Sequence, residues 1–117
     1  MAKTIQSFDE LDFFAQVKKR PGAFFGKPSL LSLRDYVFGM DYAFSFCTAE
    51  APLQYFSLFV DWYHNTILQD VSGYACWWNH ILYTCGHDDE CAFYTFFRYF
   101  EQYLLSEHQI VLPSPQS

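Results

Sequence analysis

Basic residues are scarce in this sequence of 117 residues, in which 7 lysines and arginines face 13 aspartates and glutamates. Six of the bases lie in residues 1–34, beside three acids, whereas residues 35–117 hold ten acids and only one base, Arg98. Nucleic-acid binding needs clustered lysine and arginine, so we expect no nucleic-acid partner. The acidic part either attracts a basic protein or only keeps the chain soluble.

Long apolar runs are also missing. The long uncharged stretch at residues 71–86 contains serine, asparagine, histidine and threonine, so it is too short and too polar for a membrane-spanning helix. Asp9 and Glu10 interrupt the N-terminal segment where a secretory signal would be apolar. We therefore expect a cytoplasmic protein that has no membrane partner and whose four cysteines remain thiols.

Motifs of known catalytic sites are absent. The sequence has no Gly-x-Ser-x-Gly nucleophile elbow and no His-Glu-x-x-His metal motif. Three consecutive acids, residues 88–90, could serve as acid–base groups, but acids at a helix start are more commonly caps. We expect a protein that is not an enzyme and holds no cofactor.

A Cys-x-x-Cys pair is missing as well, although cysteine and histidine gather in one region. Cys76 and His80 are four residues apart and would share a helix face, and Cys85 and His87 follow closely. Zinc accepts such ligands, but cysteines inside aromatic helices usually pack as small apolar groups. We predict no metal site. The alternative is a helical regulatory or ligand-binding module with a metal or small molecule at these four residues.

Apolar residues are abundant, at 51% of the chain, and 22% of all residues are aromatic. Such a chain has enough apolar area to offset the entropy lost on folding, which excludes disorder. Its length suits one domain and is too short for two independent cores. We therefore treat residues 1–117 as a single domain.

Apolar residues recur at helical spacing along most of the chain, which predicts an all-α bundle of about five helices. A capping box at residues 7–10 predicts that the first helix begins at Ser7, with Glu10 reaching back, and it should end before Pro21. Ser29 is the expected cap of the second helix. The buried row of that helix is predicted to be Leu30, Leu33, Val37, Met40, Phe44 and Cys47.

Three further helices follow in the same way. The third should begin at Pro52, and the fourth should run from about Tyr74 to a stop at Gly86. Asp88 or Asp89 should cap the fifth, which should extend to about Ser106. Residues 108–117 are expected to form a short extended tail, and a β-element near residues 109–112 stays open.

The segment between the first two helices contains two prolines and two glycines, which predicts a loop. Its Walker-like spacing is one residue short, so no phosphate site is expected. We assign structural roles in this turn to Arg20, Pro21, Gly22 and Gly26.

Aromatic residues are densest in residues 93–103, where seven of eleven positions are aromatic. One helix face cannot hold them all. They either close a large core or line a protein-binding surface beside acids. Trp77 and Trp78 point about 100° apart on a helix, so one should lie in the core and the other near the surface.

The predicted turn between the first two helices resembles a segment of a known group of proteins. Residues 18–30 (Lys-Lys-Arg-Pro-Gly-Ala-Phe-Phe-Gly-Lys-Pro-Ser-Leu) resemble a turn found in small bacterial helical proteins that have a tyrosine-rich second helix. Trp77–Leu82, the acids at 88–90 and Ala92–Phe97 follow in the same order as in that group. These proteins are similar to immunity proteins of toxin–immunity systems, including contact-dependent growth inhibition.

The resemblance implies a protein that binds and neutralises one cognate toxin. We expect the toxin to be a basic nuclease domain, with acidic side chains covering the cationic surface that would bind nucleic acid and aromatic side chains providing burial. The candidate contacts, chosen for charge and expected exposure, are Glu50, Asp61, Tyr63, Asp70, Tyr74, Trp78, Asp88, Asp89 and Glu90.

Overall fold

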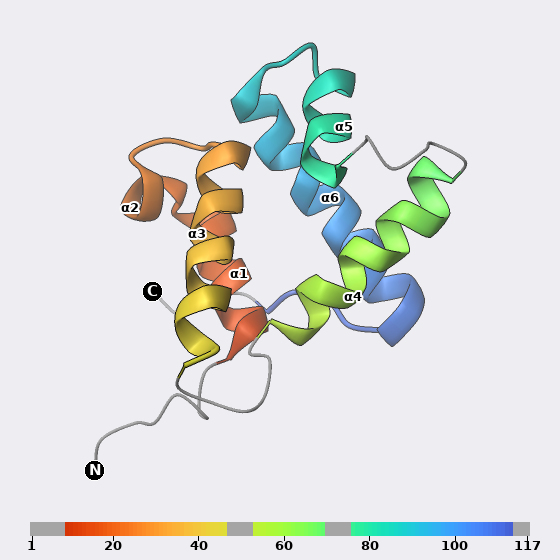
Figure 1. Cartoon of the computed structure of the whole chain (residues 1–117), viewed down its shortest axis with the longest axis horizontal. Coiled ribbons are helices and arrows are strands. Elements are labelled where there is room, and N and C mark those ends of the chain that lie inside the picture. The colour runs from red at the N-terminus through yellow and green to blue at the C-terminus, as the bar shows by residue number, and fades with distance from the viewer. Residues whose placement is uncertain (1–8, 47–52, 70–75, 114–117) are drawn as a thin grey trace.

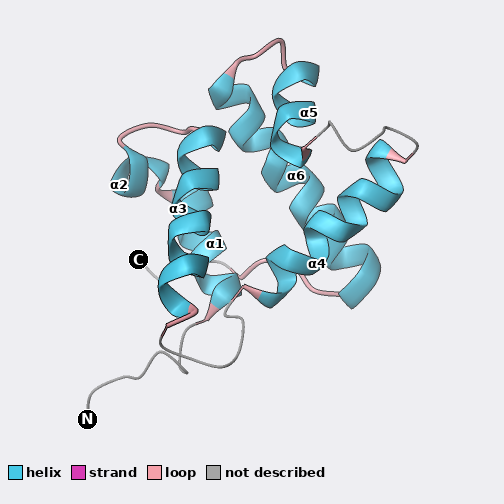
Figure 2. Cartoon of the chain, in the orientation of Figure 1, coloured by secondary structure: helices cyan, strands magenta, loops and turns pink. Residues whose placement is uncertain are grey.

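Helices make up nearly all of the regular structure. The structure is a computed structural model, and it describes residues 9–46, 53–69 and 76–113. Within these ranges the chain forms α-helices and one π-helix and no strand, which confirms the all-α fold (Figures 1 and 2). The elements are α1 (Glu10–Lys19), α2 (Pro21–Phe25), α3 (Leu30–Phe44), α4 (Gln54–Tyr63), the π-helix (His64–Leu68), α5 (Trp77–Thr84) and α6 (Asp89–His108).

Helix α2 corrects the loop predicted between the first two long helices. Pro21 stands at its first position, where a missing N–H costs nothing. Arg20 joins α1 to α2: its N–H donates to the Gln16 carbonyl over 2.9 Å and its carbonyl accepts from the Ala23 N–H over 3.0 Å. The prediction that α1 ends before Pro21 is confirmed, but the residues after it make one further helical turn.

Three of the helices begin at a side-chain cap. The Ser29 hydroxyl caps α3, and the Asp88 carboxylate caps α6 by accepting from the N–H of Glu90, so both predicted caps are confirmed. The capping box at α1 is wrong: Asp9 accepts from the N–H of Asp12 over 3.1 Å. Ser7, Pro52 and Tyr74, the other predicted helix starts, lie outside the described residues.

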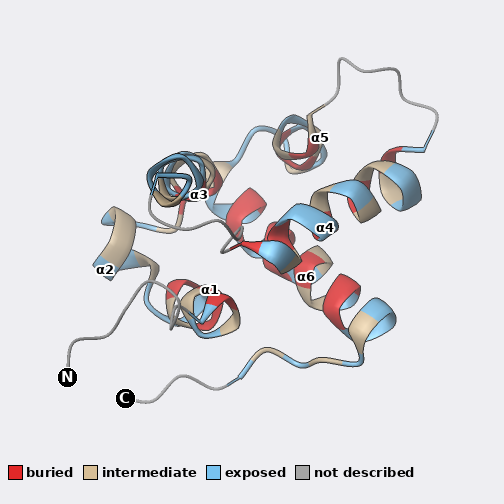
Figure 3. Cartoon of the chain, turned by 60° about the horizontal axis from the view of Figure 1, so that its bottom comes forward, coloured by how far each residue is buried: buried red, intermediate tan, exposed pale blue. Residues whose placement is uncertain are grey.

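Helix α6 lies at the centre of the bundle. It packs against α3, α4 and α5 (Figure 3). Phe14 of α1 also reaches it, with ring contacts to Phe97 and Phe100. Because neighbours surround it, α6 buries aromatic residues on several sides, which accounts for their density there. The buried members are Phe93, Phe96, Phe97, Phe100 and Tyr103.

The core is a cluster of aromatic rings. Phe59 is fully buried and lies 5.5 Å from the ring centroid of Phe96 and 6.2 Å from that of Trp77. Each fully buried phenylalanine contributes about 1.5–3 kcal/mol relative to an exposed one, and edge-to-face ring pairs add about 0.5–1.5 kcal/mol. Ring packing between helices therefore supplies most of the burial that holds them together.

The chain after α6 is extended and docked. Gln109 has a φ of 54° and ends the helix, and the half-buried Ile110 and Leu112 pack against the core. Up to Pro113, where the description ends, this segment forms no strand. In the described part of the chain, no helix has the length and apolar character needed to cross a membrane.

A buried carboxylate connects α1 to α4. The two oxygens of Glu10 accept hydrogen bonds from the backbone N–H of Tyr55 (2.9 Å) and of Phe56 (2.7 Å). Leu53, at the cap position of α4, cannot satisfy these groups with its own side chain. Glu10 therefore caps a helix that begins more than 40 residues later, instead of closing its own helix as predicted.

Burial raises the pKa of Glu10 to about 7, against the opposing effect of the backbone N–H groups of α4, and the charge of Asp41 adds to the rise. The folded chain therefore holds this proton more tightly than the unfolded chain does. The contribution of Glu10 to the free energy of unfolding is therefore complete below the pKa that Glu10 has in the unfolded chain. It decreases as pH rises through 7, by about 3 kcal/mol at most.

Glu10→Gln tests this linkage. The amide keeps an oxygen acceptor for α4 but does not titrate, so the loss of unfolding free energy between about pH 5 and about pH 8 should become smaller in the variant. Glu10→Ala leaves buried N–H groups without an acceptor and should cost about 2–4 kcal/mol. Urea unfolding at both pH values measures these effects. An identical pH slope in Glu10→Gln and the unmodified chain would contradict the assignment.

The two glycines of the α2 turn should respond differently to substitution. Gly26 has a φ of 80°, which an L side chain disfavours, whereas a Cβ at Gly22 meets no atom within 4 Å and stands in a helix. Gly26→Ala should lower the unfolding free energy by about 1 kcal/mol. Gly22→Ala should leave it unchanged or raise it slightly. Thermal unfolding of the two variants makes the comparison, and equal effects would refute it.

Candidate protein-binding surface

Helix α3 carries apolar residues on two opposite faces. Leu30, Leu33 and Val37 are buried, as predicted. A second row, at four-residue spacing, points away from the core: Phe38 and Tyr42 of α3, with Phe46 two residues after its end, are 47%, 71% and 74% exposed. Small soluble proteins seldom leave adjacent large aromatic side chains in water, so this row is a candidate contact surface.

Ring contacts order this row and extend it to α5. Tyr42 and Phe46 pack edge to face with ring centroids 5.1 Å apart, and Phe38 packs in the same way on Trp78 at 5.6 Å. The Arg34 guanidinium lies 5.3 Å from the centroid of the Trp78 ring. The Trp77–Trp78 prediction is confirmed, since the first is buried and the second half-buried.

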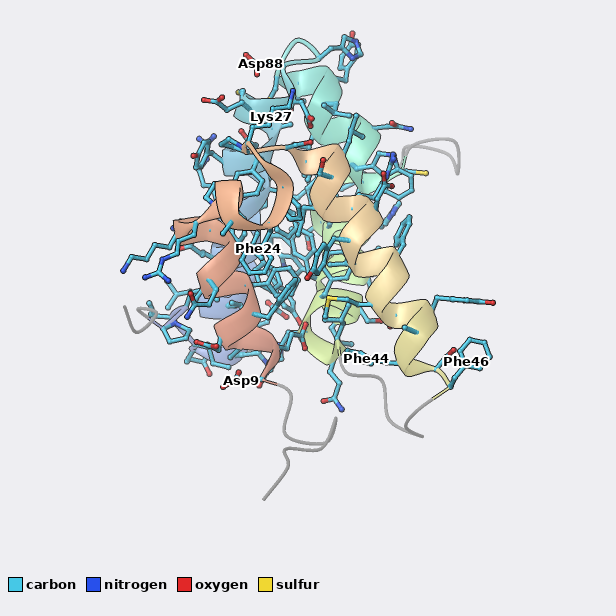
Figure 4. The ribbon with its side chains drawn as sticks, turned by 90° about the vertical axis from the view of Figure 1, so that its left-hand side faces the viewer. Asp9, Phe24, Lys27, Phe44, Phe46 and Asp88 are labelled. Atoms are coloured by element: carbon cyan, nitrogen blue, oxygen red, sulfur yellow. The ribbon has the colours of Figure 1, made fainter. Side chains whose placement is uncertain are left out.

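Acidic side chains border the same row. Asp35 and Asp41 are exposed on α3, and the carboxylate of Asp35 forms an ion pair with the guanidinium of Arg34 at 2.9 Å. Figure 4 shows Phe46 at the end of α3, directed away from the other helices. We call this surface the α3 outer face, and it consists of Asp35, Phe38, Asp41, Tyr42, Phe46 and Trp78.

The acids at the start of α6 have separate roles. Asp88 and Glu90 are exposed, and Asp88 is the cap of α6. Asp89 turns toward α3, where it accepts from the N–H of Leu31 over 3.0 Å and from the Ser29 hydroxyl. Asp89, predicted as a toxin contact, therefore connects two helix starts, because its carboxylate is already occupied.

Tyr63 is a second correction. Its side chain is fully buried, and its hydroxyl is hydrogen-bonded to Nδ1 of His80 at 2.6 Å. Burial raises the pKa of this phenol. A side chain with no exposed surface cannot touch a partner of the folded protein, so Tyr63 is a core residue.

The remaining candidates do not form one surface. Asp61 is exposed on α4, and its charge acts on Tyr103 near the end of α6. Asp88 lies at the start of α6, about 22 Å from Tyr103 at 1.5 Å per helical residue. Glu50, Asp70 and Tyr74 lie outside the described residues.

The alternative prediction was a metal or small-molecule site at the cysteines and histidines. In the described residues, no three potential metal ligands lie close together. Cys76, Cys85 and Cys91 are free thiols, and the Cys85 sulfur lies 3.3 Å from the Thr95 hydroxyl. His80 is bonded to the buried tyrosine described above. Together with Asn79, Leu82, Tyr83 and His87, it lines an open pocket of about 340 Å³.

Sequence reasoning missed most of the α3 outer face. The buried row of α3 was recognised, but the row that begins at Phe38 is offset from it by half a turn and has the same four-residue spacing. Two apolar rows on opposite sides of one helix predict that one of them is left without a core to cover. That signal was present in the sequence.

Comparisons with models of protein families, with curated proteins and with solved structures find no match for this chain.

Substitution at the start of α6 separates a structural acid from a surface acid. Asp89→Ala removes the bond to the Leu31 N–H and should lower the unfolding free energy by about 1–3 kcal/mol. Glu90→Ala is the matched control: it also removes a first-turn acid, but an exposed one, and should change stability by less than about 0.5 kcal/mol. Urea unfolding compares the two variants. Equal losses would show that only the helix dipole is affected.

Proposed function

We propose that this chain is an immunity protein that binds a basic toxin domain, such as a nuclease, and neutralises it by covering its active-site surface. The observation that carries the proposal is the α3 outer face. It combines large exposed aromatic side chains with exposed carboxylates along α3 and the turn that follows it.

The aromatic row suits a protein partner. Tyr42 and Phe46 are each more than 70% exposed and are held against each other by an edge-to-face contact. Rigid aromatic side chains lose little conformational entropy on binding and often contribute most of the binding energy at an interface. Burial of this row in the interface would slow the dissociation of the complex.

The charge of the chain supports a basic partner. Asp41 is exposed on α3, between Phe38 and Tyr42 in the sequence, and forms no ion pair among the described residues, whose two ion pairs are Lys18–Glu101 and Arg34–Asp35. The acidic excess of residues 35–117 would attract a cationic surface over about 10 Å at 0.1 M salt. Neutralisation by this route needs no chemistry from the chain, only occupation of the toxin's phosphate-binding surface.

A double variant, Tyr42→Ser with Phe46→Ser, tests the face. It should weaken binding to the proposed cognate toxin domain by at least about 100-fold, while the thermal unfolding temperature stays the same, because both side chains are exposed. Isothermal calorimetry measures the affinity, and growth during toxin co-expression measures protection.

Tyr83→Ser with Tyr94→Ser is the matched control, since these tyrosines are 74% and 47% exposed on other helices. It should leave binding and protection intact. The association rate with the unmodified chain should fall as salt rises, and the dissociation rate should change less. Full affinity in the α3 double variant would exclude the α3 outer face, and absence of any affinity for a toxin domain would exclude the function.

A further inference from the structure

A second surface feature lies on the opposite end of the bundle from the start of α6. Between α4 with its π-helix and the last turns of α6 is an open pocket of about 410 Å³. It is formed from two segments about 40 residues apart in the chain and is separate from the α3 outer face. The residues that line it are Leu58, Trp62, Asn65, Thr66, Tyr103, Glu107 and His108.

The pocket walls are aromatic and held in place. The Trp62 and Tyr103 ring centroids are 5.6 Å apart. The Tyr103 hydroxyl is hydrogen-bonded to Nε2 of His108 at 2.7 Å, and the His108 ring packs edge to face on Tyr55 with ring centroids 5.1 Å apart. Aromatic faces attract cations, and tryptophan does so most strongly.

The π-helix, which begins at His64 directly after α4, contributes to the lining of the pocket. Its wider turn ends where the Gln69 N–H donates to the His64 carbonyl over 3.0 Å. Asn65 and Thr66, in this turn, line the pocket together with Trp62, and each of their side chains carries an acceptor oxygen. Single π-helical turns are less stable than α-helix and are frequent at functional sites.

The electrostatic environment is negative. Glu107 lines the pocket, and the charges of Glu107, Glu10 and Asp61 raise the pKa of Tyr103 after the larger effect of burial. Neither Glu107 nor Asp61 belongs to an ion pair in the described part of the chain. The last turn of α6 also directs its carbonyl groups to this end, which favours a cation. Among the residues that the structure describes, no lysine or arginine lines the pocket.

We propose that this α4–α6 pocket binds a guanidinium group, stacked on Trp62 and hydrogen-bonded to Glu107. A guanidinium is flat, so it can lie on an aromatic face, and it presents five N–H donors to a site with several acceptors. An ammonium group has the charge but neither the plane nor the paired donors. The proposal goes beyond the proposed function, because the site would accept a free guanidinium compound or an arginine side chain.

Three blocked amino acids of matched size test the proposal by NMR titration of the full chain. N-acetyl-arginine amide should shift the Trp62 indole resonance, and this shift should saturate as the compound is added. Its affinity should be at least about tenfold above that of N-acetyl-lysine amide. N-acetyl-citrulline amide has the same shape without the charge and should not bind. Equal binding by the three compounds, or no binding of the arginine compound, would overturn the proposal.

Variants confirm the location. Glu107 is exposed, and glutamine has nearly the same shape as glutamate. Glu107→Gln should therefore lower the affinity for N-acetyl-arginine amide about tenfold or more. Glu101→Gln is the control, because Glu101 is on the same helix but is paired with Lys18 at 2.7 Å, and it should have no effect. An unchanged affinity in Glu107→Gln would place the binding elsewhere and overturn the site.

The source of the guanidinium is decided by one further titration. A blocked Ala-Arg-Ala peptide that binds clearly more tightly than N-acetyl-arginine amide would support an arginine side chain of a protein as the natural occupant. Equal affinities would support a free guanidinium compound. Binding of the peptide that survives Glu107→Gln would count against the pocket.

Discussion

The structure depends on carboxylates that cap helices other than their own. Glu10 of α1 accepts the first N–H groups of α4, and Asp89 of α6 accepts an N–H at the start of α3. Each bond fixes where a helix begins relative to a distant part of the chain, and aromatic packing then closes the space between them. Through these two contacts, α3 presents its outer face and α4 places Trp62 against α6.

This arrangement explains why acids near helix starts were only partly understood from the sequence. Local rules identified Ser29 and Asp88, because each caps the helix that follows it within a few residues. The same rules assigned Glu10 to its own helix and gave Asp89 as the alternative cap of α6, and its charge made it a candidate toxin contact. Their true partners are 45 and 58 residues away, and no local pattern encodes a bond across the fold. The helices themselves followed from apolar spacing, which is a local property.

The binding surfaces show the same limit. Asp61 is exposed and Trp78 belongs to the α3 outer face. The prediction for Tyr63 was wrong, because this ring is buried and packs against His80 of α5 and Tyr99 of α6. The α4–α6 pocket is lined by residues of two separate segments, and Trp62 contacts Tyr103 across it. By contrast, Phe38, Tyr42 and Phe46 recur at four-residue spacing in one continuous segment, so a helical wheel predicts this exposed row, although it does not predict the contact of Phe38 with Trp78 of α5.

The central functional claim is that a basic toxin domain covers the α3 outer face. Hydrogen–deuterium exchange of the complex, read by mass spectrometry, tests this most directly, because it reports which backbone segments become protected without any substitution. The account predicts new protection over residues 35–46 and around Trp78. Protection confined to the basic α1–α2 region, with exchange at α3 unchanged, would contradict it.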